Sequence, residues 1–286
     1  MSTHPTKPMA VLLPLPDILR NRDAHKLPII RLTWWHGALL CALLLASATI
    51  ADAASAPAKA GVFAILLRWT PLLLSGFGLN ILISVMSMGI GTALGAFLGL
   101  ALISPNRPLS ATAWAVTQFF RNAPWLVLLF FMIFILPYHM AIGGFTFTLP
   151  DWVKAVIGLS LPVMANVAEI VRGGVQSIPK GQWEASESLG FTRHQQLWQI
   201  ILPQAVKRMI PPWMNLYAIL TTSTTLASIV GVSDVVTLAA QVLSAEGSRP
   251  DLLAPIYGYV LVMFYLYIYP IAWATRRLER KYQVRN

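Results

Sequence analysis

The sequence is short of charged residues. Only 11% of its 286 residues are Asp, Glu, Lys or Arg, against about 25% in a typical soluble domain. Hydrophobic residues make up 56% of the chain, and the mean hydropathy is +0.64. So few charges cannot cover the surface of a soluble fold of this size, and so much apolar sequence excludes a disordered chain. The composition therefore predicts a membrane protein.

Other absences exclude several chemistries. Cys41 is the only cysteine, so the chain has no internal disulfide and no cysteine-based metal site. No Walker-type glycine loop is present, so this chain alone has no visible means of hydrolysing ATP. We therefore expect no catalytic residues, no metal site and no cofactor bound by this chain. The histidines have no ligand spacing and are scattered over the sequence: His4, His25, His36, His139 and His194.

Long uncharged runs are what the sequence has instead. Five gaps between charged residues contain 20, 38, 29, 25 and 24 residues, and about 20 apolar residues suffice to cross a bilayer as a helix. A sixth run, 155–168, reaches that length only by including Glu169 and Arg172. We predict an all-α polytopic membrane protein with about six transmembrane helices, a five-helix core preceded by one N-terminal helix. The expected spans are 32–51, 75–103, 122–140, 154–173, 212–233 and 252–274.

The basic residues predict the orientation. With the N-terminus in the cytoplasm, 17 of the 21 Lys and Arg residues lie inside and 4 outside, as the positive-inside rule requires. The net charge of +10 is then explained by the membrane topology, and a nucleic-acid partner is not needed to explain it. We expect both termini in the cytoplasm of a bacterium and the protein in its inner membrane. Residues 1–31 form a cytoplasmic leader, and 283–286 a short C-terminal tail.

The first hydrophobic segment has two interpretations. Residues 32–60 read as a transmembrane helix with an outer loop, but the small residues of 51–56 also resemble a signal-peptide cleavage site. We favour the retained helix because about thirty residues precede it, which is long for the start of a signal peptide. Residue 60 begins outside the membrane in both cases.

The polar segment 176–203 lies between the fourth and fifth spans, on the cytoplasmic side. Pro179 can open a short helix, and Gly190 can end it in the left-handed conformation. Thr192 and Gln195 have the spacing of a capping box for a second helix. The segment therefore predicts a helix, a tight turn and a second helix.

This helix–turn–helix shape is compatible with two functions and with an ordinary structured loop that has no function of its own. A DNA-binding helix-turn-helix needs a free polar recognition helix, but here the second helix runs through Leu197 and Trp198 into the membrane. Nucleic-acid binding is therefore rejected. A docking element for a cytoplasmic partner and an ordinary structured loop remain.

The same residues resemble those of a known family. Glu184-Ala185-Ser186-x-x-x-Gly190, followed by Ile201-Leu202-Pro203, looks like the EAA loop of ABC-importer permeases. Three flanking segments resemble the polar amino-acid branch of that family: Ala168 to Trp183, Phe120-Arg121-x-x-Pro124-x-Leu126-Val127 and Leu226-Ala227-Ser228-x-x-Gly231-Val232. The resemblance covers roughly residues 70–282. It departs from the family at Thr222-Ser223, where many members have Lys-Asp, and at Asn122-Ala123, where Gly-Thr is common.

The resemblance implies a function and partners. A type I ABC-importer permease domain, here 61–282 with its coupling loop 176–200, moves solutes by alternating access. Two cytoplasmic ATPase subunits carry ATP and Mg²⁺, a second permease subunit completes the pore as a homodimer or homologous heterodimer, and a periplasmic binding protein delivers polar amino acids. Membrane lipid surrounds the chain. The implied ATPase-coupling residues are Gly181, Trp183, Glu184, Ala185, Gly190 and Pro203.

Candidate substrate-path residues are polar side chains within spans. Glu169 and Arg172 are three residues apart on one helix face, so they can contact a zwitterionic substrate or simply pair with each other. The hydroxyls of 221–225 can line a polar path or bond to their own helix. The candidates are Asn166, Glu169, Arg172, Thr221, Thr222, Ser223, Thr224 and Thr225. The alternative function is a stand-alone secondary transporter or channel for small polar solutes, which would need its own coupling-ion site.

Overall fold

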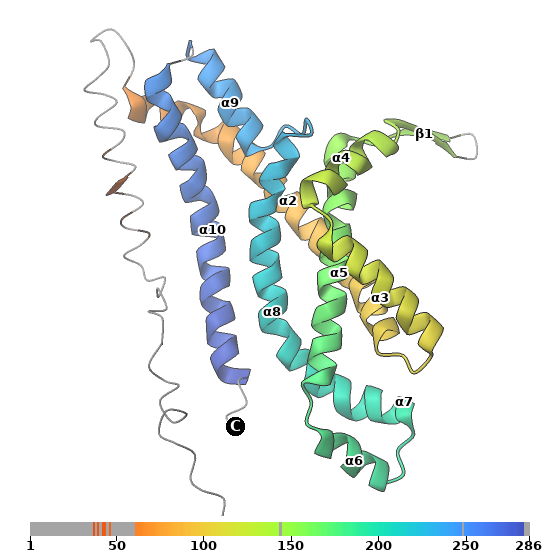
Figure 1. Ribbon diagram of the computed structural model, residues 1–286. Coiled ribbons are helices and arrows are strands. Elements are labelled where there is room, and N and C mark those ends of the chain that lie inside the picture. Colours follow the sequence, from red (N-terminus) through yellow and green to blue (C-terminus); the bar gives the residue numbers. More distant parts are fainter. Residues whose placement is uncertain are drawn as a thin grey trace, which may run out of the picture.

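The computed structural model describes residues 61–142, 145–247 and 249–282, together with five helical residues between 37 and 46. The predictions for the leader 1–31, for most of 32–60 and for the tail 283–286 lie outside the described residues. Four long helices dominate the rest (Figure 1): α2 (Val62–Leu102), α5 (Asp151–Gln176), α8 (Leu202–Ser223) and α10 (Leu253–Tyr282).

Shorter elements connect the long helices. α3 (Arg107–Asn122) and α4 (Trp125–Ile135) lead into a hairpin of β1 (His139–Ile142) and β2 (Phe145–Thr148), in which His139 pairs with Thr148. After α5 come α6 (Lys180–Ser188), α7 (Arg193–Gln195) and the π-helix η2 (Gln196–Ile201). After α8 come the 3₁₀ helix η3 (Thr224–Ser228), α9 (Val235–Ala245) and a second 3₁₀ turn, η4 (Pro250–Leu252). We call the end of the bundle that carries α6 and α7 the loop end, and the opposite end the hairpin end (Figure 1).

Two apolar clusters hold the long helices together. One joins the first half of α2 to α9 and α10 through buried residues such as Leu73, Val235 and Ile256. The other joins the middle of α2 to α5 and α8, with Ile83 and Leu220 among its fully buried side chains. α5 therefore packs against both α2 and α8.

A glycine stripe brings α2 and α5 together. Gly91, Gly95 and Gly99 recur every four residues on one face of α2 and are all buried. A Cβ atom on any of them would lie within 2.6 Å of an atom of α5, on Val163, Met164 or Val171 respectively. Small residues at this spacing let helix backbones approach closely in membranes, so the stripe fixes the distance between the two helices.

The predicted all-α membrane architecture is confirmed, and its details differ. Among the described residues, three helices, α2, α5 and a segment from Pro250 to Arg280, are long and apolar enough to cross a membrane, or four if α3 and α4 count as one span. α3 and α4 meet at an angle of 101°, because Pro124 drives Ala123 into an extended conformation with ψ 135°. The expected span 122–140 therefore contains only the second helix of a bent pair, α4, and the first residues of the β-hairpin.

The fifth expected span is also displaced. We predicted 212–233, but α8 begins at Leu202 and ends at Ser223, where the chain tightens into η3. Charge counting missed the start because Lys207 and Arg208 lie within the helix. Pro211 and Pro212 also lie inside α8.

Candidate functional site

The turn between α6 and α7 is built as the sequence predicted. α6 begins directly after Pro179, and Gly190 has φ +79°. The Gly190 N–H donates to the Glu187 carbonyl at 2.9 Å, and the Phe191 N–H donates to the Ser186 carbonyl at 3.2 Å. These two bonds form the Schellman motif that ends a helix on a left-handed glycine.

The second short helix is continuous with a membrane helix. Thr192 and Gln195 form the predicted capping box. The chain then widens into the π-helix η2, in which the Leu202 N–H donates to the Leu197 carbonyl. Pro203 has no N–H, and its ring crowds the preceding turn, so the wider turn accommodates it at the start of α8. A displacement of the turn therefore reaches α8 without a flexible linker.

The outer face of α6 is free, but Trp183 is not part of it. Gly181, Glu184 and Ala185 are exposed. Trp183 is half-buried and packs on a small cluster that includes Val175. Its ring also carries the Arg193 guanidinium at 4.1 Å from the ring centroid. Trp183 was expected in the docking face, but its side chain faces the body of the protein.

One residue of this face was missed from the sequence. Leu189, the C-cap residue that directly follows α6, is 76% exposed. A leucine this exposed beside Ala185 and Gly190 extends the free face of α6 with apolar surface. The sequence did offer one sign of an exposed apolar residue here. Leu189 stands at the end of the expected helix, directly before Gly190, and the capping motif assigns it no apolar contact.

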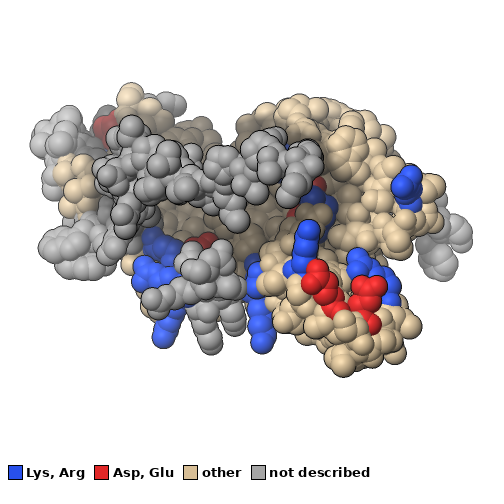
Figure 2. Space-filling view, turned by 60° about the horizontal axis from the view of Figure 1, so that its bottom comes forward, with Lys and Arg blue, Asp and Glu red and all other residues tan. Residues whose placement is uncertain are grey.

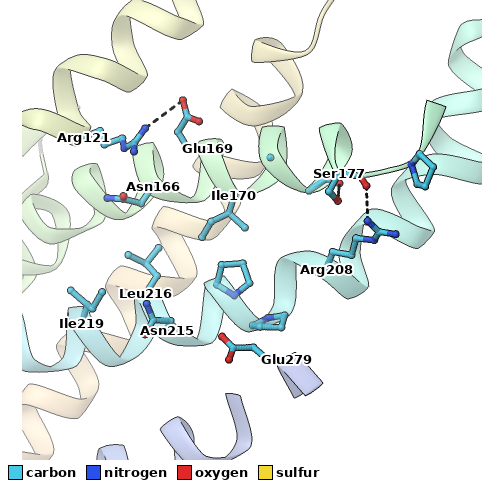
Figure 3. A pocket seen from close by; sticks show the side chains of 15 residues that line it. Arg121, Asn166, Glu169, Ile170, Ser177, Arg208, Asn215, Leu216, Ile219 and Glu279 are labelled. Atoms are coloured by element: carbon cyan, nitrogen blue, oxygen red, sulfur yellow. Dashed lines mark hydrogen bonds and ion pairs between the residues drawn. The ribbon is translucent and has the colours of Figure 1, made fainter. Parts of the chain in front are cut away.

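The second feature of the loop end is a cavity of about 910 Å³. α5 and α8 form its walls, with Arg121 at the end of α3 and Glu279 near the end of α10 (Figure 3). Of the candidate path residues near α5, Asn166 and Glu169 line the cavity and Arg172 does not. Pro211 and Pro212 form part of the α8 wall.

Glu169 is held by several partners at once. Its Oε2 accepts bonds from Arg172 Nη2 at 2.7 Å and Nε at 3.0 Å. Its Oε1 lies 3.8 Å from Arg121 Nη1 and accepts a bond from Gln118 Nε2 at 3.4 Å. Glu169 and Arg172 therefore do pair with each other, and Arg121, which we had not selected as a path residue, adds a second guanidinium at the cavity wall. Figure 3 shows Arg121, Glu169 and Asn166 close together on one side of this cavity.

The hydroxyl run 221–225 lies at a helix end and not in the middle of a span. Each of its five hydroxyls donates to a backbone carbonyl three or four residues earlier. Thr221 and Thr224 are fully buried, while Thr222 is exposed. None of these five residues lines the cavity. The geometry thus matches the backbone-bonded alternative for the run.

A buried polar cluster near this run was not foreseen. Asn80 of α2 donates from Nδ2 to Thr224 Oγ1 and to Asp234 Oδ2, both at 3.1 Å, and its Oδ1 accepts from the Val235 N–H. Asp234 caps α9 by accepting from the Thr237 N–H at 2.9 Å. Asn80, Thr224 and Asp234 are fully buried. The cluster ties α2, η3 and α9 together.

Basic side chains gather at the loop end, as Figure 2 shows, while acidic side chains form a smaller patch there. Arg208 is one of the basic residues, and its Nη1 donates to the Ser177 carbonyl at 2.5 Å, which joins α8 to the end of α5. Within the part of the chain that the structure describes, no group of His, Cys, Asp and Glu residues could hold a metal ion.

Long apolar helices, a cavity between them and a helix-turn-helix at one end define the architecture of a membrane permease. Residues 91–283 match the family model of the binding-protein-dependent transport system inner membrane component. The chain belongs to this family, and the resemblance to ABC-importer permeases of the polar amino-acid branch is confirmed. It is an integral membrane protein, and permeases of this family are transport subunits, not enzymes, that work with ATPase subunits and substrate-binding proteins.

Similar proteins cover most of the chain. The L-cystine transport system permease protein TcyB of Bacillus subtilis (strain 168) is 32% identical over 212 residues, which are 74% of this chain and 86% of TcyB. The arginine transport system permease protein ArtQ of the same organism is 34% identical over 200 residues, 69% of this chain and 89% of ArtQ. A solved amino acid ABC transporter with histidines has the same fold, with a TM-score of 0.65 at 24% identity over 78% of this chain and 99% of that chain.

Proposed function

We propose that this chain is the permease subunit of an ATP-driven ABC importer that moves polar amino acids into the cytoplasm by alternating access. Family membership supports the transporter class, and relatives named for cystine and arginine transport support amino acids as the substrate class. The observation that carries the coupling mechanism is the rigid helix-turn-helix of α6 and α7, which projects at the loop end and runs directly into α8 (Figure 1).

The loop end faces the cytoplasm in this proposal. Lys and Arg residues follow or precede the membrane helices at this end, and the positive-inside rule then puts both termini in the cytoplasm. The hairpin end faces the periplasm, where a substrate-loaded binding protein meets the loops around β1–β2 and α9. Cysteine-accessibility labelling that found Ser188, which is exposed on α6, outside the cell would refute this orientation.

The proposed assembly has two permease subunits and two ATPase subunits. The second permease is a copy of this chain or a homologue of it. ATP and Mg²⁺ bind to the ATPase subunits, and this chain binds no cofactor. Closure of the ATPase dimer moves α6, and the movement passes through η2 into α8, which forms a wall of the cavity.

The docking face proposed for the ATPase consists of Glu184, Ala185 and Leu189. Ala185 allows close approach, Glu184 supplies a charge, and Leu189 supplies an apolar side chain that is 76% exposed before docking. Burial of an exposed leucine side chain contributes about 1.5–3 kcal/mol through the apolar surface removed from water. Gly181, Gly190 and Pro203 shape the element, and Trp183 supports it from the inner side.

The proposed substrate path runs through the cavity beside Asn166 and Glu169. Arg121 lines the cavity beside Glu169, and Arg172 pairs with the same carboxylate from outside the lining, so these three side chains together carry one net positive charge. Such a wall suits the carboxylate of an amino acid, since charge-assisted hydrogen bonds to guanidinium groups are strong.

Reconstitution tests the proposed function. The chain is purified with its ATPase, placed in proteoliposomes with its binding protein, and assayed for uptake of a panel of labelled amino acids. We expect uptake that requires ATP and all components. Amino-acid uptake by the permease alone, without ATP, would favour the secondary-transporter alternative and refute the proposal.

The docking face has its own test. Leu189→Ser should weaken retention of the ATPase by about tenfold or more, because loss of an interface anchor costs about 2 kcal/mol. Leu109→Ser is the matched control, since Leu109 is also exposed, at 48%, but lies on α3. Equal retention by both variants would show that Leu189 is not part of the interface.

A further inference from the structure

A second cavity lies at the loop end, apart from the proposed substrate path. Its volume is about 490 Å³, which is within the range of small-molecule sites. The ends of α2 and α5 form one side, and α6, α7 and η2 form the other. It does not share a lining residue with the larger cavity.

The lining of this second cavity is apolar on the membrane side. Leu102, Ile103, Val175 and Leu197 line it, and α2 and α5 are both long and apolar enough to cross a membrane before they end here. The cavity therefore lies where two spanning helices leave the hydrocarbon layer. Trp198, which is 50% exposed one residue after Leu197, is a typical membrane-interface residue.

The polar side of the cavity carries one cation. The Arg193 guanidinium lies over the Trp183 ring, with its Cζ 4.1 Å from the ring centroid, and the Arg193 residue is exposed. Within the described part of the chain, no carboxylate lies within 4 Å of Arg193. A guanidinium held in this way has donors for an anion.

Two neutral groups stand beside this cation. Ser104 Oγ accepts a bond from the Asn106 N–H at 3.2 Å, which leaves its own O–H to donate. Gln176 Oε1 accepts from Arg172 Nη1 at 2.9 Å, which leaves the Gln176 amide N–H groups to donate. Both residues line the cavity with Arg193. The polar side thus carries N–H and O–H donors from a guanidinium, an amide and a hydroxyl.

We infer that this cavity binds the phosphate headgroup of an anionic phospholipid. Arg193, Ser104 and Gln176 hold the phosphate oxygens, and the apolar lining from α2 and α5 receives the first part of an acyl chain. Basic pockets between membrane helices are suited to anionic headgroups. The bound lipid joins the ends of α2 and α5 to α7, and so braces the coupling element. Lipid binding depends on the cavity and not on the proposed substrate, while the bracing role rests on the proposed function of α6 and α7.

Lipid binding is measured on the purified permease–ATPase complex by native mass spectrometry after delipidation. The probes are dioleoyl phosphatidylglycerol, dioleoyl phosphatidylcholine and inorganic phosphate. We expect the wild-type complex to bind phosphatidylglycerol more tightly than phosphatidylcholine, and Arg193→Gln to weaken phosphatidylglycerol about tenfold, as loss of a charge-assisted bond implies. Arg107→Gln, which removes an exposed arginine at the start of α3, should bind as the wild type does.

A conservative variant separates binding from folding. Arg193→Lys keeps the charge but loses the planar donors, so we expect a smaller loss than in Arg193→Gln. Equal binding of both lipids by the wild type, or unchanged phosphatidylglycerol binding in both variants, would overturn the inference. Displacement of the lipid by an equal concentration of inorganic phosphate would show a free-phosphate site. Loss of the ATPase with unchanged lipid binding would assign Arg193 to the docking surface.

Discussion

Replacing Gly95 by alanine tests whether the glycine stripe sets the distance between α2 and α5. An added Cβ would lie 2.6 Å from the Met164 carbonyl oxygen and 2.6 Å from Val167 Cβ. The carbonyl belongs to the backbone of α5 and cannot rotate away. The two helices would have to separate by roughly 0.8 Å to restore ordinary contact, and such overpacking costs about 1–3 kcal/mol.

Gly89→Ala is the matched control on the same helix. A Cβ at Gly89 meets no atom within 4 Å, so this variant shows only the intrinsic preference of a helix for alanine, about 0.5–1 kcal/mol in its favour. Gly95→Ala gains the same preference. The difference between the two variants therefore isolates the cost of overpacking, about 1–3 kcal/mol of unfolding free energy.

Thermal unfolding of the detergent-solubilised complex, followed by size-exclusion chromatography of heated samples, measures this difference. At about 2–4 °C per kcal/mol, Gly95→Ala should melt roughly 2–12 °C below Gly89→Ala. If the two variants melt at the same temperature, α2 and α5 do not pack through Gly95, and the reasoning from the stripe fails.

Two further substitutions probe the polar cluster and the turn. Asn80→Ala removes the N–H donors to Asp234 and Thr224 and leaves a buried carboxylate short of a partner, so the free energy of unfolding should fall by about 2–4 kcal/mol. Asn122→Ala, at the exposed end of α3, is the control and should change the free energy of unfolding little. Equal melting temperatures of the two variants would show that the hydrogen bonds of Asn80 do not stabilise the fold. In Gly190→Ala, the alanine must adopt φ +79°, which costs about 1 kcal/mol. We therefore expect reduced ATP-dependent uptake at unchanged expression. Uptake at the wild-type level would show that the angle of this turn is unimportant.

Local chemistry explains what could be predicted from the sequence. The opening of α6 after Pro179, the left-handed Gly190 and the capping box from Thr192 to Gln195 each depend on residues within a few positions. The membrane class followed in the same way from runs of apolar residues. These features could be read directly because the interactions that fix them are close in sequence.

The remaining features depend on contacts between distant segments. Asn80 and Asp234 are 154 residues apart, and only the packing of α2 against α9 brings them together. Arg121 faces Glu169 because the chain bends by 101° just after α3, and a count of charge-free residues cannot detect that bend. α2 likewise begins before Arg68, although the charge-free run begins only after it. The exposed Arg68 side chain reaches Glu246, with Nη1 3.9 Å from Oε1, so the helix can contain this charge.

Pro211 and Pro212 give α8 a bending point in the cavity wall. Neither proline has an N–H to donate to the carbonyl four residues before it, so a bend here breaks no bond that these residues would have made. Eleven residues follow Pro212 in α8, and a bend of about 5° would move the far end of that segment by about 1 Å. Because Pro211 and Pro212 also line the cavity, a pull on α8 from the proposed coupling loop would change the width of the cavity before it moved the hairpin end.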